Sequence, residues 1–219
     1  MKIFYINLKD RVDRKEHMEN MLTNLNLQYE RFPAFKLTPE EIKEDYKLFY
    51  DKCVPRFKSY INSKDAKIIK RGIGAFGCYM SHLKIHAMMV DKPIEPYIIL
   101  EDDVIITQKT IDELAELQEE LDTWDMIRSM WHTTDKLVKM RGVNGESKHA
   151  KKTEFVHSAF GGTHFTVFND ASKIFNYLLE ENLFSIDGVY CTEFLDVYHK
   201  KLDVELYPFE SDIPRYGES

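Results

Sequence analysis

The chain has 219 residues, of which 43% are hydrophobic and 31% are charged, a composition that excludes collagen-like and disordered proteins. With 30 lysines and arginines against 37 acidic residues, the formal net charge is −7, which excludes the overall basic charge of a nucleic-acid-binding protein. No apolar run approaches the roughly 20 residues of a membrane span, and no signal sequence is recognisable. We therefore expect a single domain over residues 1–219, located in the cytoplasm or at the cytoplasmic face of a membrane.

The first elements have the order of an α/β nucleotide-binding fold. Residues 2–8 (KIFYINL) predict a strand, and a charged turn then leads into a helix with apolar residues at helical spacing. Arg11 and Arg14 lie three residues apart at the start of this helix, so they can point together toward the loop end of the sheet. Because cations are mildly unfavourable at a helix N-terminus, we favour an anionic ligand over simple solvation of the two arginines.

The next segment combines clear and unclear patterns. Residues 28–35 predict a second strand, and residues 38–41 (TPEE) have the pattern of a capping box that starts a helix extending to about Lys52. Residues 53–71 mix basic residues with a proline and show no clear periodicity. We assign no element to them and expect this stretch to be the most mobile.

Residues 72–77 (GIGAFG) match the G-x-G-x-x-G pattern of a dinucleotide-binding turn. That turn needs a hydrophobic strand directly before it, and residues 64–71 (KDAKIIKR) are a poor strand. We therefore interpret the glycines as positions where the backbone passes close to a ligand or a neighbouring element. A helix is predicted from about residue 78 to residue 90.

Two histidines and three cysteines are possible metal ligands. His82 and His86 are spaced i, i+4 on this helix, but Leu83 stands where a zincin has glutamate, so we favour ordinary buried or hydrogen-bonded histidines. Ser81 and His82 also suit a helix start that faces a ligand. The three cysteines are widely spaced and form no Cys-x-x-Cys pair, so we interpret them as small buried residues in a reducing compartment.

The acidic stretch is the most informative feature of the sequence. Residues 97–100 (YIIL) follow Pro96 and predict a central strand buried on both faces. The strand ends in Glu101, Asp102 and Asp103. Ligands of open α/β sheets gather at the carboxyl ends of such strands, so the sequence predicts a cation site there.

The C-terminal half continues the alternation of strands and helices. Helices are predicted at residues 111–121 and 170–179 and from the turn at 185–188 to about 201, strands at 125–131, 155–168 and 204–207, and a long surface loop at 132–153. The strand at 155–168 is interrupted by Gly161 and Gly162, which are followed by Thr163 and His164. Because glycines inside a strand mark a bulge or the close approach of a ligand, Gly161, Gly162 and Thr163 are candidates for sugar or acceptor contacts. The whole pattern predicts a mixed α/β sandwich.

Three blocks occur in chain order: Ile6-Asn7-Leu8 followed by Arg11 and Arg14, residues 74–82 (G-x-x-G-C-x-x-S-H), and residues 100–104 (LEDDV). A fourth, weaker block is Ser185-Ile186-Asp187. Together these blocks resemble glycosyltransferase family 25, which includes bacterial lipopolysaccharide glycosyltransferases and procollagen galactosyltransferases.

The resemblance implies a GT-A-like domain with a mixed central sheet, in which about residues 1–104 bind the nucleotide and about residues 105–219 bind the acceptor. It implies that Asp103 binds a divalent metal directly, Mn²⁺ first and Mg²⁺ as the alternative. Glu101, also a metal candidate, and Asp102 would approach the ribose or hold metal-bound waters. The other nucleotide-binding residues that we expect are Asn7, Leu8, Arg11, Arg14, Ser81 and His82.

The resemblance further implies transfer of a hexose from a UDP-sugar to a glycan or protein hydroxyl, with inversion. An inverting transfer needs a base, for which Asp187 is our first candidate and Glu193 our second; a helix cap is an equally good explanation of Asp187. We expect no nucleic-acid partner, and association with a membrane would be peripheral. Two other classes of function stay open, a non-catalytic nucleotide-sugar-binding module and an NAD-dependent oxidoreductase built on residues 72–77.

Overall fold

The computed structural model describes residues 1–129, 138–140, 163–181, 186–190, 195–199 and 201–208. Its main feature is a seven-stranded mixed sheet, which confirms the predicted mixed α/β architecture. In spatial order the strands are β2 (Tyr29–Pro33), β1 (Lys2–Asn7), β3 (Tyr97–Glu101), β7 (Phe165–Phe168), β5 (Met126–Ser129), β8 (Val197–His199) and β6 (Val138–Met140). A second, two-stranded sheet pairs β4 (Val104–Ile106) with β9 (Val204–Leu206) in antiparallel orientation.

The sheet joins an N-terminal half to a C-terminal half at β3 and β7. Strand β1 runs parallel to both β2 and β3, whereas β7 lies antiparallel to β3 and to β5. The carboxyl ends of β1 and β3 therefore meet at one edge, and the start of β7 is brought to the same edge. This topology assembles the polar residues described below.

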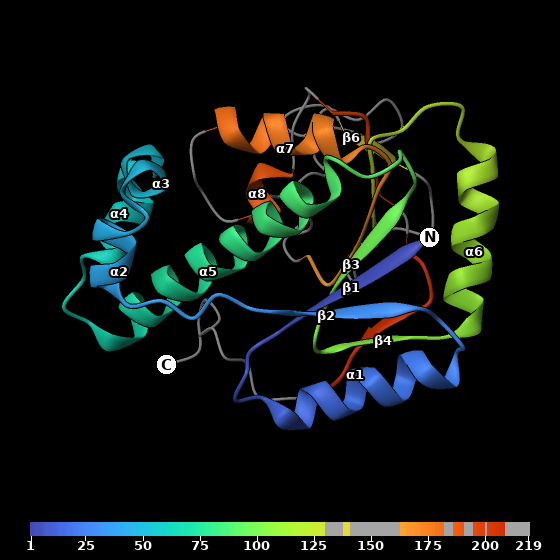
Figure 1. Ribbon diagram of the computed structural model, residues 1–219, viewed down its shortest axis with the longest axis horizontal. Helices are drawn as coiled ribbons and strands as arrows, with labels where there is room; N and C mark the ends of the chain where they lie inside the picture. Colours follow the sequence, from blue (N-terminus) through green and yellow to red (C-terminus); the bar gives the residue numbers. More distant parts are fainter. Residues whose placement is uncertain (130–137, 141–162, 182–185, 191–194, 200, 209–219) are drawn as a thin grey trace.

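Helices cover both faces of the sheet (Figure 1). Helices α5 (Ala66–Met89) and α7 (Ala171–Glu180) pack on one face, and α1 (Val12–Asn24) and α6 (Gln108–Glu120) pack on the other. The side chains of β3 alternate between the two cores: Tyr97 and Ile99 face α5 and α7, and Ile98 and Leu100 face α1 and α6. All four are fully buried, so the prediction of a central strand buried on both faces is confirmed.

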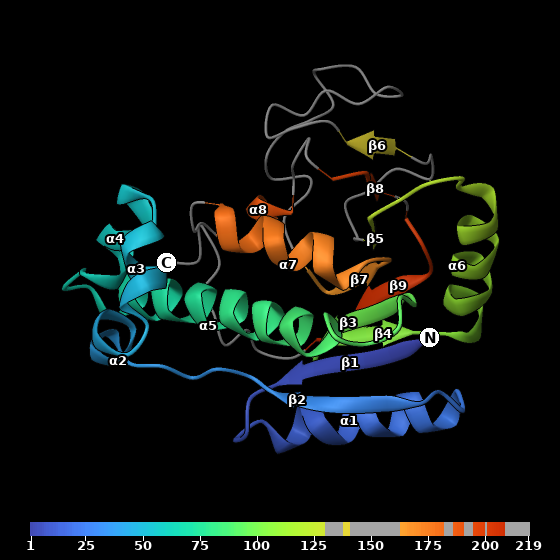
Figure 2. The ribbon, with the colours of Figure 1, turned by 45° about the horizontal axis from the view of Figure 1, so that its top comes forward.

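Three short helices form one end of the molecule, beside the N-terminal part of α5 (Figure 2). They are α2 (Pro39–Glu44), α3 (Lys47–Lys52) and α4 (Pro55–Ile61). The capping box of α2 is confirmed, because the Thr38 side chain accepts a hydrogen bond from the Glu41 backbone N–H and the Glu41 side chain accepts one from the Thr38 backbone N–H. The prediction of a single helix up to Lys52 is wrong, because the helix is interrupted between α2 and α3. At this interruption Tyr46 packs against aromatic rings of neighbouring segments.

Residues 53–71, which show no clear periodicity in the sequence, are largely helical. Proline at the first position starts α4, and Phe57 and Ile61 are its buried residues, one turn apart. Asp65 caps α5 by accepting hydrogen bonds from two backbone N–H groups. The exposed, charged first turns of α5 hid its periodicity in the sequence.

The glycine-rich segment lies inside α5 and is not a loop, so a dinucleotide-binding turn at residues 72–77 is excluded. A Cβ added at Gly77 would lie 2.4 Å from the carbonyl oxygen of Phe35, and one at Gly72 would lie 2.9 Å from Tyr60 Cβ. The glycines therefore allow α5 to pass close to neighbouring backbone, as predicted. The helix begins at Ala66, twelve residues before the predicted start at 78 (78 − 66 = 12).

The C-terminal half contains two further corrections. Part of the predicted surface loop is strand β6, which pairs with β8. The helix predicted up to residue 201 is instead a single turn, α8 (Ile186–Val189), followed by β8, because Val197 is needed in the sheet core. Gly161, Gly162 and Glu193 lie outside the described residues, and no helix among those described is long and apolar enough to cross a membrane.

Candidate active site

The acidic triplet lies where β3 ends and turns into β4, and the pleat of the strand divides it between the two faces of the sheet. Glu101 continues the alternation of Tyr97 and Ile99 and points toward α5. Asp102 points the other way, toward α1. The three consecutive carboxylates therefore lie in different surroundings, and each contacts a different set of side chains.

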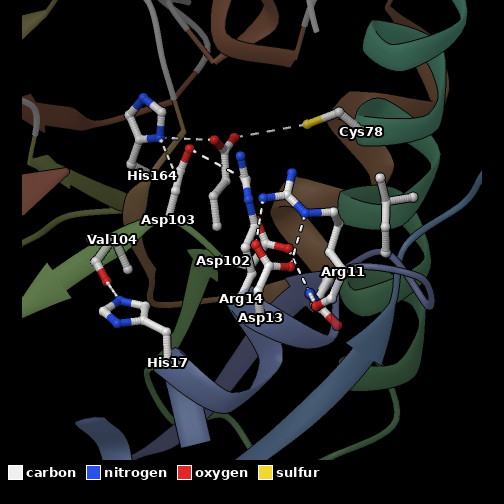
Figure 3. A network of polar contacts seen from close by, with 12 residues as sticks. Arg11, Asp13, Arg14, His17, Cys78, Asp102, Asp103, Val104 and His164 are labelled. Atoms are coloured by element: carbon white, nitrogen blue, oxygen red, sulfur yellow. Dashed lines mark hydrogen bonds and ion pairs between the residues drawn. The ribbon is translucent and has the colours of Figure 1, made fainter. Parts of the chain in front are cut away.

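Asp102 is engaged by the protein itself. Its Oδ1 accepts a hydrogen bond from Arg14 Nη1 at 2.6 Å, and its Oδ2 accepts one from Asn7 Nδ2 at 2.7 Å (Figure 3). Burial raises the pKa of Asp102, and this effect exceeds the lowering by the Arg14 and Asn7 hydrogen bonds. Both carboxylate oxygens are thus used to join β3, β1 and α1 at the edge of the sheet.

Asn7 extends this network along the end of β1. Its side-chain oxygen accepts a hydrogen bond from Arg31 Nε at 2.9 Å, and its amide also donates to the Arg11 carbonyl at 3.0 Å. Leu8 follows in the loop and accepts from the Arg11 backbone N–H, while the Arg11 side chain pairs with Asp13 at 2.8 Å. The structure therefore brings Asn7, Leu8, Arg11, Arg14 and Asp102 together, and binding of a nucleotide by them stays a prediction.

Glu101 and Asp103 converge on His164, which directly precedes β7. His164 Nδ1 lies 2.8 Å from Glu101 Oε2 and 3.3 Å from Asp103 Oδ1. Thr163, the neighbouring residue, donates its hydroxyl hydrogen to the other Glu101 oxygen. Figure 3 shows His164 facing Asp103 above the Arg14 network.

The charges of Glu101 and His164 shift each other's pKa values, and Asp103 adds to the shift of His164. Burial opposes the charged form of His164, but Glu101 and Asp103 outweigh it and raise the pKa of this histidine. Burial raises the pKa of Glu101, and the nearby imidazolium and its hydrogen bonds reverse this effect and lower it. Without a metal, a protonated His164 therefore balances the two carboxylates.

The same three side chains lie close enough together to hold a cation. One ligand atom from each of Glu101, Asp103 and His164 lies within 4.8 Å of the others. Carboxylate oxygens and a neutral imidazole are ligands that Mn²⁺ accepts, so these residues fit the metal that the sequence predicts. The sequence analysis does not include His164 among the candidate ligands, and its place beside Thr163 and the two glycines is the only signal that points to it.

Cys78, Ser81 and His82 lie on helix α5, on the side of the sheet toward which Glu101 points. Ser81 is fully buried, donates to the Gly77 carbonyl and accepts from the Phe35 N–H, so it joins α5 to the segment after β2. The prediction that Ser81 and His82 start a helix is wrong, since α5 begins at Ala66. Their nucleotide-binding role stays a prediction, and complete burial of both side chains disfavours it.

The two histidines of α5 are buried and hydrogen-bonded, as favoured from the sequence. His86 contacts the hydroxyls of Tyr97 and Tyr190, at 2.6 and 2.8 Å, and His82 Nδ1 lies 3.0 Å from Tyr190 Oη. Burial lowers the pKa of His82 to about 4 and lowers that of His86 as well, so both are neutral at pH 7.

Asp187, the first candidate for the base, lies in the single turn α8 on the same side of the sheet as α5. Its Oδ1 accepts a hydrogen bond from the next backbone N–H, and its carbonyl accepts one from Arg128 at 3.3 Å. Burial raises the pKa of Cys78, and the charges of Glu101 and Asp187 raise it further. Asp187 is the second residue of α8 and not the residue before the helix, so it is not a conventional N-cap.

The mixed α/β sheet, with carboxylates at the carboxyl end of a central strand and a histidine beside them, is consistent with a GT-A-like fold. The chain belongs to glycosyltransferase family 25: the sequence model described as "Glycosyltransferase family 25 (LPS biosynthesis protein)" matches residues 1–184.

Individual relatives agree with this assignment. A glycosyltransferase 25 family member of Drosophila melanogaster is 33% identical over 106 residues, which cover 47% of this chain and 16% of that protein. Procollagen galactosyltransferase 2 of Mus musculus is 26% identical over 58% of this chain and 20% of its own length. A putative glycosyltransferase of Acanthamoeba polyphaga mimivirus is 34% identical over 48% of this chain and 29% of its own length. The matched parts thus span less than a third of these relatives.

Proposed function

We propose that this chain is a metal-dependent glycosyltransferase that moves a hexose from a UDP-sugar to a hydroxyl of a glycan or protein acceptor, with inversion. The observation that carries the proposal is the convergence of Glu101, Asp103 and His164 at the carboxyl end of β3, in a chain of this family. The name of the murine relative, procollagen galactosyltransferase 2, favours galactose as the hexose.

The negative charges of the protein and of the sugar diphosphate explain why the proposed transfer needs a metal. The protein has a net charge of −7, and a sugar diphosphate adds further negative charge next to two carboxylates. Asp103, Glu101 and His164 would hold Mn²⁺ or Mg²⁺, which when bound binds phosphate oxygens and stabilises negative charge on the departing diphosphate. Arg14 lies 3.5 Å from Asp103 and adds a second positive charge at this edge.

The three acids then have separate roles. Asp103 and Glu101 serve the metal, whereas Asp102 positions Arg14 and Asn7 and so fixes the loop between β1 and α1. Because its two oxygens already accept hydrogen bonds, we assign Asp102 to positioning and not to the ribose. Asp187 is the base that removes the proton of the acceptor hydroxyl as the sugar carbon is attacked.

The proposal is tested by incubating the full chain with a panel of UDP-hexoses, with and without Mn²⁺, and measuring released UDP. We expect slow Mn²⁺-dependent release of UDP from one donor in the absence of acceptor, and faster release when a suitable acceptor is added. Calorimetry that shows donor binding, together with no cleavage over a wide acceptor panel, would support the non-catalytic binding module instead.

Metal binding should release a proton from His164. Because Glu101 and Asp103 raise the pKa of His164, the metal must displace a proton that the metal-free protein holds at neutral pH. The affinity for Mn²⁺ should therefore increase by up to about tenfold per pH unit over the range in which His164 is protonated. Titration calorimetry in buffers of different ionisation enthalpy measures both the affinity and the proton released.

The matched variant is His164→Gln, which keeps a polar side chain of similar length without an ionisable group. It should bind Mn²⁺ more weakly, with little dependence of the affinity on pH between 6 and 9. Equal pH dependence in the unaltered chain and the variant would show that His164 is not the group that loses the proton.

A further inference from the structure

A second group of metal-binding side chains lies on the other side of Glu101. It consists of Cys78 and His82 on α5 together with the Glu101 carboxylate, and one ligand atom of each lies within 4.8 Å of the others. Cys78 and His82 are four residues apart, so they project from the same face of the helix. The strand end carries Glu101 toward that face.

Glu101 presents a different oxygen to each group. Oε2 lies beside His164, whereas Oε1 lies 3.9 Å from Cys78 Sγ and accepts the Thr163 hydrogen bond. A tetrahedral ion with bonds of about 2.0 to 2.3 Å spaces its ligand atoms roughly 3.5 Å apart. Small side-chain rotations would therefore bring Cys78 Sγ and Glu101 Oε1 to ligand spacing.

His82 supplies the independent evidence for a ligand. The side chain is fully buried, and its Nε2 has no hydrogen-bond partner among the described residues. A buried, unpaired ring nitrogen is costly unless a further partner is present, and His82 belongs to the cluster with Cys78 and Glu101.

The other ring nitrogen of His82, Nδ1, has a hydrogen-bond partner, as is usual for histidines that bind a metal. Nδ1 lies 3.0 Å from Tyr190 Oη, and Tyr190 Oη lies 2.8 Å from His86 Nε2. If Nδ1–H of His82 donates to Tyr190 and Tyr190 donates to His86, Nε2 carries a free lone pair. An outer partner that fixes the tautomer and orientation in this way is typical of histidine ligands.

We propose that Cys78 Sγ, His82 Nε2 and Glu101 form a second metal site, selective for a thiophilic divalent ion such as Zn²⁺ or Cd²⁺. A thiolate and an imidazole favour such ions over Mn²⁺ and Mg²⁺, which prefer oxygen ligands. On binding, the Cys78 S–H bond breaks, its proton leaves to solvent and a sulfur–metal bond forms. Cys78 as a whole residue is only partly buried. The site does not depend on the proposed transferase activity.

The test is a titration of the metal-free full chain with Cd²⁺, monitored by the ultraviolet charge-transfer absorption of the cadmium–thiolate bond. The unaltered chain should show a rise that ends at one Cd²⁺ per chain, and Cys78→Ser should abolish it. Tyr190→Phe, which removes the outer partner of His82, should weaken Cd²⁺ binding roughly 10- to 100-fold. His82→Gln, which removes the ligand itself, should weaken it at least as much.

Matched controls separate this site from other metal binding. Cys53 is buried and donates to the Phe49 carbonyl, so Cys53→Ser should keep the absorption band, as should Cys191→Ser. His164→Gln should also keep it, whatever that substitution does to Mn²⁺ binding.

No band in the unaltered chain, or an unchanged band in Cys78→Ser, would overturn the proposal. If Cys78→Ser does not fold, X-ray absorption of the Zn²⁺-loaded unaltered chain decides: a sulfur ligand at about 2.3 Å supports the site, and a shell of only nitrogen and oxygen overturns it.

Discussion

Replacing Asp103 by asparagine should lower Mn²⁺-dependent release of UDP from the donor by about 10²- to 10³-fold, the range seen when one preorganised electrostatic contact is removed. Asparagine keeps the size of the side chain but removes the negative charge, so the cation loses its main carboxylate. Released UDP is measured at saturating Mn²⁺, and Mn²⁺ affinity is measured separately by calorimetry.

The matched control is Asp122→Asn, which removes one negative charge at an exposed position near the end of α6. Its activity should equal that of the unaltered chain, because a distant exposed charge is screened by salt. If Asp103→Asn retains full activity and unchanged Mn²⁺ affinity, the assignment of the metal to this turn is wrong.

Replacing Arg14 by methionine should lower the free energy of unfolding by about 3 to 5 kcal/mol, the range found when one partner of a buried ion pair is removed. The Arg14 and Asp102 side chains are 6% and 10% exposed, so solvent cannot replace the lost partner. Urea denaturation followed by circular dichroism measures this free energy.

The loss should depend on pH in a defined direction. Burial already raises the pKa of Asp102, and removing Arg14 raises it further, so the folded variant favours the protonated carboxyl. A raised pKa in the folded state adds stability below the unfolded-state pKa of about 4, and this stability is lost as the pH rises through the folded-state value. The variant should therefore differ most from the unaltered chain at neutral pH and least near pH 4.

A double-mutant cycle with Asp102→Leu gives the control. The double variant Arg14→Met, Asp102→Leu should be more stable than Arg14→Met alone, because no charge is left buried without its partner. If the effects of the two substitutions simply add, the ion pair does not stabilise the edge of the sheet as described.

Local signals in the sequence predicted much of the fold. The apolar runs at β1 and β3, the capping box before α2 and the helix predicted at 170–179 each depend on residues close together in the chain, and each is confirmed. The errors fall where tertiary packing decides. The first turns of α5 are charged and exposed, and the helix begins twelve residues before its predicted start (78 − 66 = 12). The neighbours that its glycines contact, Tyr60 and Phe35, come from other segments.

The site was predicted in part for the same reason. The acidic triplet follows a strand, so its place at the edge of the sheet could be inferred from residues 97–103 alone. The split between Glu101 and Asp102 also follows from the pleat, but their partners do not. Arg14 and His164 reach the triplet from elements 88 and 63 residues away in sequence (102 − 14 = 88; 164 − 101 = 63), through the parallel pairing of β1 and the antiparallel pairing of β7 with β3.

The most direct test of the metal site is a crystal structure of the full chain soaked with UDP and Mn²⁺, with anomalous diffraction used to locate the manganese. We predict one manganese peak bonded to Asp103 and His164, with Glu101 as a further ligand and the diphosphate of UDP on the open side. A manganese ion bound elsewhere, or UDP bound at this edge with no manganese near Asp103, would contradict the proposed role of the acidic turn.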